Sequence, residues 1–412
     1  MPEDLRPSDA AQVAQMLAWA AAETKTVELV GAGSKMDLGR PMETDYRLHL
    51  SALEGVNLYE PEELVLRAGA ATSLGQIQAM LAQQNQQLAF EPPDFSELYG
   101  HNRDQTIGGV LATNLAGPRR LKAGAARDHF LGLEAVSGRG AAFKSGGRVV
   151  KNVTGYDLCK LMAGSFGTLA ALTEVTVKVL PAPEKIRTVL LFGRDDRAAI
   201  TAMSQAAGSP HEVSALAHLP RAIAARSAVA YVKNAGAAVT AVRVEGPGPS
   251  VAHRTNALRE QWGAIGEVEE LHAHNSNTLW REVGNVAALL PDPDPDTGAV
   301  IWKLSVTPSK GAEVMTAALA QGGQGYYDWA GGLLWLALPQ SEDGGGDGGA
   351  ALVRGAFGSD GHATLMRGPV ALRQQVDVFQ PTAAPLAALS ARIKASFDPH
   401  GILNPGRMHG AY

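Results

Sequence analysis

The first glycine-rich turn of the chain, Gly31-Ala-Gly-Ser-Lys35, restricts the possible folds more than any other short stretch. It follows the strand-like run Val27–Val30, as the first glycines of a Rossmann fingerprint would. The third glycine of that fingerprint is missing, because position 36 is Met36, and the next regular run, Tyr46–Leu50, alternates like a strand. A Rossmann domain is therefore disfavoured. The turn can still gather backbone N–H groups into a nest for a diphosphate, although it also fits an ordinary turn.

A second cluster of small residues lies between Thr106 and Gly117, with glycine or alanine at positions 108, 109, 112 and 116 and Gly117 closing it. Each glycine in a helix costs about 1 kcal/mol relative to alanine, so this density needs a compensating contact. Close approach of a flat ligand is one explanation. Tight packing of a helix against a sheet is the alternative.

The third and most specific stretch is Lys151–Leu169, which leads into the β-branched strand Thr173–Leu180. Pro181-Ala-Pro183 ends that strand, and we place a domain boundary there. Near the C-terminus, Leu386–Phe397 has the pattern of an amphipathic helix. Short strands alternating with helices in this way indicate an α+β fold.

Composition excludes several classes of function. The single cysteine, Cys159, rules out an internal disulfide and an iron–sulfur cluster held by this chain alone. A formal charge of −5 argues against nucleic-acid binding. Residues 119–160 nevertheless carry a net charge of +6, which implies an anion site or a partner surface, or else a solvated basic face. No stretch approaches the roughly 18 apolar residues of a membrane span, and no signal peptide is recognisable, so we expect a cytoplasmic protein.

Five motifs together resemble those of the vanillyl-alcohol oxidase family, whose members share the PCMH-type FAD-binding domain. They are Gly31–Lys35, Thr106–Gly117, Val153–Leu158, Gly164–Thr168 and Phe397–Arg407. Within this family the sequence is most similar to the FAD-binding subunits of glycolate oxidases. The resemblance is close over residues 1–182 and 386–412 and loose over the middle of the chain.

The resemblance implies three structural parts. Residues 1–182 would form a two-lobed PCMH-type FAD-binding domain of α+β class. Residues 183–385 would form a smaller α+β cap domain on the substrate or partner side. Residues 386–412 would supply a helix and a loop that return to the FAD-binding domain.

The resemblance also assigns cofactor contacts to thirteen residues. The residues expected to hold the diphosphate are Gly31, Ala32, Gly33, Ser34 and Lys35. Those expected along the diphosphate and the flavin are Thr106, Gly108, Gly109, Asn114 and Gly117. Gly167 and Leu172 would border the adenine, and Asn404 would return from the C-terminus toward the isoalloxazine. Phe166 and Ala170 depart from the commoner family pattern.

Two further expectations concern the cofactor and metals. Some relatives attach the flavin through a His in the first glycine loop, which here reads Ser34-Lys35-Met36, so the resemblance implies a non-covalent FAD. Relatives that oxidise 2-hydroxy acids by themselves carry an H-x-x-G-D-x-x-x-H metal cluster in the middle domain. This chain offers only His272-Ala-His274 there, so we expect no metal site.

Aromatic residues in the second half of the chain are expected to belong to the core. They could form a substrate cage, but aromatics near strand-like runs are more often buried for packing. The residues concerned are Trp302, Tyr326, Tyr327, Trp329 and Trp335. Cys159 is likewise expected to be a buried structural thiol.

The resemblance implies the oxidation of a small 2-hydroxy acid, such as glycolate, to the 2-oxo acid by an FAD-binding subunit that is not self-sufficient. Its partners would be a second FAD-binding subunit and an iron–sulfur subunit, with electrons passing to a quinone, and only these partners would bring it to the inner face of the cell membrane. No catalytic base is identifiable. The alternative is a non-catalytic flavin relay or assembly subunit of the same complex.

Overall fold

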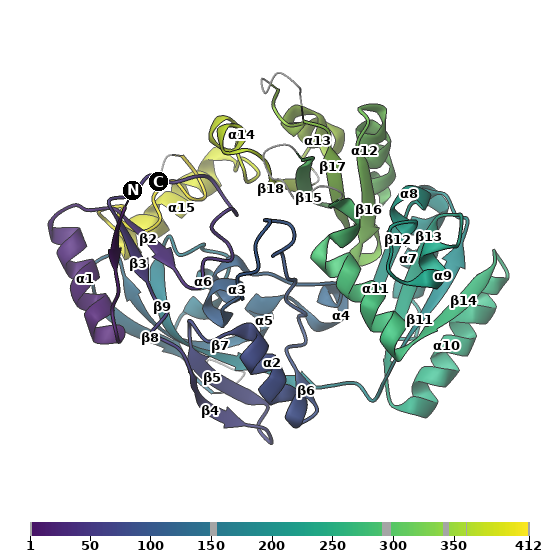
Figure 1. Cartoon of the computed structure of the whole chain (residues 1–412), viewed down its shortest axis with the longest axis horizontal. Coiled ribbons are helices and arrows are strands. Elements are labelled where there is room, and N and C mark those ends of the chain that lie inside the picture. Colours follow the sequence, from purple (N-terminus) through teal and green to yellow (C-terminus); the bar gives the residue numbers. More distant parts are fainter. Residues whose placement is uncertain (1, 149–154, 291–297, 341–345, 360, 411–412) are drawn as a thin grey trace.

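The computed structural model describes residues 2–148, 155–290, 298–340, 346–359 and 361–410. Residues 151–154, at the start of the third glycine-rich stretch, lie outside this part of the chain. Figure 1 shows the N-terminal sheets on one side of the molecule and a large sheet on the other, with the C-terminal helix lying beside the N-terminal lobe. In the described residues, no helix has both the length and the apolar character that crossing a membrane requires.

The first lobe is a small parallel sheet. Its strands are β1 (Glu3–Leu5), β2 (Val27–Val30) and β3 (Tyr46–His49), in the order β1-β3-β2. Helix α1 (Ala10–Ala22) buries Val13 and Leu17 in the same small core as this sheet. The free edge of β2 pairs with the C-terminal segment, because Val27 and Leu403 form a parallel bridge. The last residues of the chain therefore complete the first lobe.

The second lobe is a five-stranded antiparallel sheet with short helices. Its strands, in spatial order, are β4 (Val56–Glu60), β5 (Val65–Gly69), β9 (Ala170–Lys178), β7 (Phe130–Ser137) and β8 (Ala142–Gly146). Its helices are α2 (Leu74–Gln83), α3 (Ile107–Thr113), α4 (Arg120–Ala123), α5 (Ala126–His129) and α6 (Leu158–Met162). A short pair, β6 (Gln86–Gln87) with β10 (Leu180–Pro181), closes the lobe.

An eight-stranded antiparallel sheet makes up the middle of the chain. Its strands, in spatial order, are β14 (Val268–His272), β11 (Lys185–Phe192), β13 (Val239–Gly246), β12 (Ala215–Leu219), β16 (Gln324–Asp328), β17 (Leu333–Leu338), β15 (Val300–Val306) and β18 (Gly361–Arg367). The first and last four strands form two βαββαβ units of the same strand order, joined edge to edge where His218 pairs with Tyr327. The sheet begins just after Pro181-Ala-Pro183, and the division into separate domains there stays a prediction.

The two faces of this sheet pack against different parts of the molecule. One packs on the helices α7 (Asp196–Ala207), α10 (Gly248–Gly263), α12 (Pro308–Ala320) and α13 (Ala350–Phe357). Along β15, Trp302 and Leu304 belong to that helical core, whereas Ile301 belongs to the core shared with the second lobe. Because side chains alternate along a strand, Lys303 lies on the same face as Ile301. The face that meets the N-terminal lobes thus carries both apolar and charged side chains.

The predicted C-terminal helix forms, but its buried side differs from the expectation. Helix α15 spans Ala384–Phe397. Leu386 and Leu389 are 53% and 44% exposed, whereas Lys394 is buried. The Lys394 ammonium donates to the carboxylate of Asp398 (N···O 2.6 Å) and to the carbonyl oxygen of Leu403 (2.9 Å). The helix is therefore held through a buried ion pair at its C-terminal end.

Candidate functional site

A cleft opens between the two N-terminal lobes. It lies among the loop after β2, helix α3, the start of β9 and the C-terminal segment. It holds about 830 Å³ of space between atoms, a volume that extends into open solvent. Eleven of the thirteen residues predicted from the sequence line it. They are Gly31, Ala32, Gly33, Ser34, Lys35, Thr106, Gly108, Gly109, Gly167, Leu172 and Asn404.

The first glycine turn contacts the second glycine cluster directly. A Cβ on Gly31 would lie 2.9 Å from Oγ1 of Thr106, so a larger residue would push the two loops apart. Gly33 has φ +77°, a conformation that side chains other than glycine's rarely adopt. The turn therefore requires glycine both for its own backbone and for the close approach of the two lobes.

The first two glycines of the second cluster have different neighbours. A Cβ on Gly108 would lie 2.7 Å from the carbonyl oxygen of Ala70, so this glycine allows α3 to pack closely on the second lobe. A Cβ on Gly109 would have no backbone atom among its nearest neighbours, which are Oγ1 of Thr106 at 3.1 Å and the end of the Lys35 side chain at 3.9 Å. Both sequence-based explanations thus apply, each to one residue: helix packing at 108 and an open cleft wall at 109.

Lys35 provides a positive charge in the cleft. Its ammonium donates to Oε1 of Gln105 (2.7 Å) and lies 3.3 Å from Oγ of Ser34. Burial lowers the pKa of Lys35 to about 8, although the carboxylates of Asp94 and Asp104 partly oppose this. A bound diphosphate would stabilise the protonated form and would itself be stabilised by it.

The affinity for FAD is therefore expected to depend on pH through Lys35. Because the free protein has a pKa of about 8 there and a bound diphosphate raises it, affinity is at its full value below pH 8. Above pH 8 it falls by up to about tenfold per pH unit. Fluorescence titrations with FAD between pH 6 and 9 measure this, and the Lys35→Gln variant is expected to bind weakly at every pH. An equal slope in the variant would contradict the assignment.

The C-terminal segment closes the cleft by binding both lobes. The amide of Asn404 accepts a hydrogen bond from the backbone N–H of Leu29 (2.8 Å) and donates one to the carbonyl oxygen of Phe166 (2.7 Å). The guanidinium of Arg407 donates to the carbonyl oxygen of Lys35 (2.5 Å) and lies 3.7 Å from the carboxylate of Glu28. These contacts fix the first glycine turn and the loop before β9 relative to each other.

Two predicted site residues lie outside the residues that line this cleft. Asn114 ends α3 in the left-handed conformation, and its side-chain oxygen accepts from the backbone N–H of Arg127. Gly117 packs so closely that a Cβ would lie 2.3 Å from the carbonyl oxygen of Glu91, and its own carbonyl accepts from the indole of Trp329 (3.1 Å). The structure gives both a role in holding the loop, and their contact with the cofactor stays a prediction.

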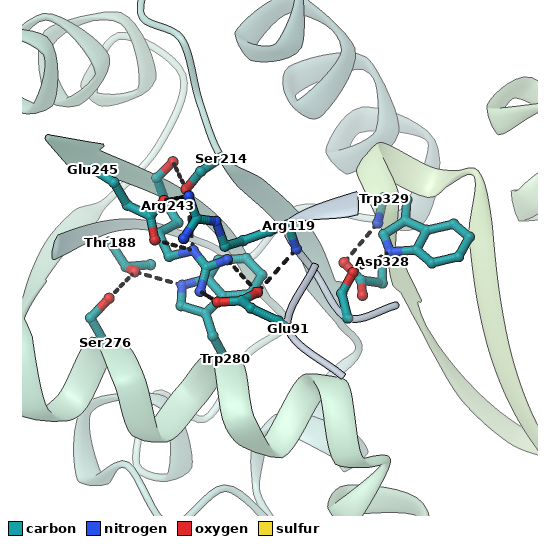
Figure 2. A network of polar contacts seen from close by, with 11 residues as sticks. Glu91, Arg119, Thr188, Ser214, Arg243, Glu245, Ser276, Trp280, Asp328 and Trp329 are labelled. Carbon is teal, nitrogen blue, oxygen red and sulfur yellow. Dashed lines mark hydrogen bonds and ion pairs between the residues drawn. The ribbon is translucent and has the colours of Figure 1, made fainter. Parts of the chain in front are cut away.

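A buried ion network joins the large sheet to the second lobe (Figure 2). Arg243 of β13 is 2% exposed and donates to both carboxylate oxygens of Glu91, at 2.9 and 2.8 Å. Arg119 lies 3.3 Å from the carboxylate of Glu245, which also contacts Arg243. Burial would lower the pKa of Arg243, but the carboxylates of Glu91 and Glu245 raise it on balance. The network therefore fixes the sheet against the loops that lead into and out of α3.

Sequence reasoning missed this network, although a signal was present. Arg243 and Glu245 interrupt the otherwise apolar strand β13, and a charged residue in a buried strand needs a partner. Three residues of the predicted basic segment 119–160 have separate partners. Arg119 belongs to the network, Lys122 pairs with Glu212 (3.1 Å), and Lys160 donates to backbone carbonyls.

The histidines considered as metal ligands are not among the residues that line the cleft. His272 ends the edge strand β14 and contacts the carboxylate of Glu270 (3.2 Å). His274 lies in α11 (Ala273–Asn285). Among the residues that the structure describes, no group of three or more His, Cys, Asp or Glu is placed to hold a metal ion. Cys159 is buried, as predicted.

Two kinds of known protein, glycolate oxidase subunits and a D-lactate dehydrogenase, are similar in sequence to this chain. A family model described as an FAD binding domain matches residues 4–146. The chain is 32% identical over 382 residues to the glycolate oxidase subunit GlcE of Escherichia coli (strain K12), which covers 92% of this chain and 91% of that protein. It is 44% identical over 113 residues to the glycolate oxidase subunit GlcD of Bacillus subtilis (strain 168), covering 27% of this chain and 23% of that protein. It is also 33% identical over 178 residues to a D-lactate dehydrogenase of Archaeoglobus fulgidus, covering 43% and 38%.

Solved structures share the fold at low sequence identity. The 4-ethylphenol oxidase from Gulosibacter chungangensis superposes with a TM-score of 0.70 at 14% identity, covering 98% of this chain and 88% of that one. An alkyldihydroxyacetonephosphate synthase gives a TM-score of 0.67 at 14% identity and covers 98% and 76%. The predicted α+β fold with a two-lobed FAD-binding domain, a cap and a returning C-terminal segment is confirmed.

Proposed function

The chain belongs to the FAD-binding oxidoreductase family that includes the glycolate oxidase subunit GlcE, and on that premise we propose that it is the FAD-binding subunit of a glycolate oxidase complex. Its substrate would be glycolate or a similarly small 2-hydroxy acid, and its product the 2-oxo acid. The observation that carries the proposal is the 32% identity to GlcE, which extends over 92% of this chain and 91% of that protein.

The cleft between the two lobes fits the cofactor. Glycines at 31, 33 and 109 keep its wall free of side chains, and Lys35 and Arg407 bring positive charge to it. Bound there, FAD supplies the acceptor for the hydride from C2 of the hydroxy acid. The chain's own residues would bind and orient the cofactor. Lys35 would neutralise the diphosphate, and Asn404 holds the first glycine turn and the loop before β9 together through its bonds to Leu29 and Phe166.

We further propose that the FAD is held non-covalently. The residues that line the cleft in the described part of the chain include no histidine or cysteine that could form the covalent link. Acid precipitation of the yellow protein is expected to release the flavin into the supernatant. Colour that stays with the pellet would contradict this.

Partner subunits are part of the proposal. The relatives named above include two glycolate oxidase subunits, GlcE and GlcD. The match to GlcD over 113 residues agrees with a second flavoprotein of related fold in the complex. The chain's one cysteine is buried, so an iron–sulfur cluster that carries electrons onward to a quinone would belong to a third subunit. Any association with the cell membrane would then come from the partners.

Anaerobic reduction by glycolate tests the proposal. The assembled complex is expected to bleach the flavin absorbance of this subunit on adding glycolate, whereas the isolated FAD-loaded chain reacts slowly or not at all. A mixed complex, in which this subunit alone carries FAD, separates the two roles. If its flavin stays oxidised with glycolate but is reduced once the other flavoprotein is restored, the alternative of a relay subunit holds.

A further inference from the structure

The face of the large sheet that meets the N-terminal lobes carries a lysine in an apolar row. Lys303 of β15 pairs in register with Trp335 of β17 and with Thr364 of β18. Trp335 belongs to the core shared with the second lobe, so this row points away from the covering helices. A charged side chain in such a row normally has a counterion, as Arg243 has on the same sheet.

Among the residues that the structure describes, Lys303 has no such partner. Its ammonium lies 5.3 Å from the ring centroid of Trp329 and 5.8 Å from that of Trp335, which are cation–π distances. Within the described residues, it forms neither a hydrogen bond nor an ion pair. The carboxylate of Asp328, the last residue of β16, influences Lys303 electrostatically but accepts its hydrogen bond from the backbone N–H of Trp329 (2.7 Å).

A second cation approaches the same ring. The guanidinium of Arg120, in α4 of the second lobe, lies 4.6 Å from the centroid of Trp329. No carboxylate pairs with Arg120 in the part of the chain that the structure describes. Burial, together with the charges of Lys303 and Arg120, lowers the pKa of His362 on β18. Two basic side chains, from β15 and α4, thus lie against one indole, and a third, from β18, is close enough for its pKa to respond to their charges.

This arrangement is electrostatically unfavourable by itself. Burial, together with the nearby charge of Arg120, lowers the pKa of Lys303 to about 8, and Asp328 opposes the shift only in part. An unpaired cation costs free energy when it leaves water, and two cations on one ring repel each other. Groups strained in this way are typical of sites that receive a charged ligand.

The cluster is connected to the cofactor cleft through a series of ring contacts. The ring of Trp335 lies 5.8 Å from that of Phe95, which in turn lies 6.4 Å from Tyr99. Tyr99 stacks on His101 at 6.2 Å, and Nε2 of His101 lies 3.2 Å from the carbonyl oxygen of Ser34, in the first glycine turn. The basic cluster therefore belongs to the wall where the large sheet faces the cofactor-binding lobes.

We propose that Lys303 and Arg120, over the rings of Trp329 and Trp335, form a metal-free binding site for the carboxylate of a small organic acid. That this acid is the 2-hydroxy acid substrate rests on the function proposed above. The carboxylate accepts hydrogen bonds from the ammonium and the guanidinium, while the two indoles exclude water around them. Trp329 and Trp335 then serve both as core residues and as the floor of the site.

Binding of oxalate, a carboxylate that offers no hydride, tests the site apart from any redox reaction. Isothermal titration calorimetry of the FAD-loaded full chain is expected to show oxalate binding. The Lys303→Met and Arg120→Gln variants are each expected to bind about 10- to 100-fold more weakly. Lys303→Arg should restore much of the affinity. Lys310→Met, which removes an exposed lysine paired with Glu313 on α12, is the matched control and should bind as the parent does.

Thermal melts distinguish a binding role from a structural one. Because Lys303 is partly buried and has no counterion in the described part of the chain, Lys303→Met is expected to leave the melting temperature unchanged or to raise it while affinity falls. Oxalate affinity equal to the parent's in both variants, or no binding to the parent, would overturn the proposal. If the variants lose oxalate binding but the parent complex does not oxidise glycolate, the carboxylate site stands and the proposed function fails.

Discussion

A chain that ends at Phe397 is expected to lose FAD binding, with an affinity at least about 100-fold below that of the full chain. Its lobes keep their own strands, but Asn404 no longer bridges Leu29 and Phe166, and the carbonyl oxygen of Lys35 loses the hydrogen bond from Arg407. The glycine turn and the loop before β9 are then free to move apart. The measurement is the fraction of flavin that stays with the protein after gel filtration, with circular dichroism to confirm folding.

Point variants separate the cofactor effect from a general loss of stability. Truncation also removes Asp398, the counterion of Lys394, so Asn404→Ala is the sharper change. It is expected to weaken FAD binding by about tenfold or more, because two hydrogen bonds that hold the cleft are lost. Asn256→Ala, at an exposed position of α10, should bind FAD normally. Full flavin occupancy in both the truncated chain and Asn404→Ala would show that the C-terminal segment only covers the lobe.

Replacing Arg243 by methionine is expected to reduce the free energy of unfolding by about 3–5 kcal/mol. The change leaves the carboxylate of Glu91 without a cation among the described residues, and Glu245 with Arg119 alone. Denaturant unfolding followed by tryptophan fluorescence measures the loss. Lys310→Met, which breaks the exposed pair with Glu313, is the control and should leave the unfolding curve nearly unchanged.

A double variant makes this prediction sharper. When Glu91→Gln accompanies Arg243→Met, Glu91 no longer carries a charge and Glu245 keeps Arg119 as its partner, so most of the lost stability is expected to return. A single variant as stable as the parent would mean that the network contributes nothing to holding the sheet on the second lobe.

Local patterns in the sequence predicted the parts of the cofactor site that lie within single loops. Gly31–Lys35, Thr106, Gly108 and Gly109 line the cleft as expected, because glycine density reports directly on backbone conformation and close approach. The partners of Asn404 were out of reach, since its amide bonds to Leu29, 375 residues earlier in the chain. No local pattern encodes a contact of that separation.

The large sheet shows two further limits of local reasoning. Its two βαββαβ units share a strand order, yet no fixed period is visible in the sequence, because topology depends on the order of elements and tolerates different side chains and loop lengths. Trp329 and Trp335 are 7% and 3% exposed, as predicted for core residues. Their contacts with Lys303 and Arg120 follow from strand pairing and domain packing, which an isolated aromatic residue does not reveal.

The hydrogen bond between Leu29 and Asn404 also determines when the cleft can close while the chain is being synthesised. A ribosome adds about 5–20 residues per second, so the first glycine turn waits about 20–75 s for the residue that closes its cleft. Over that interval the nascent chain presents a half-built pocket that cannot retain its flavin. FAD is therefore expected to bind late, and a chain that stops before residue 404 is expected to be colourless and more easily cleaved by proteases than the full chain.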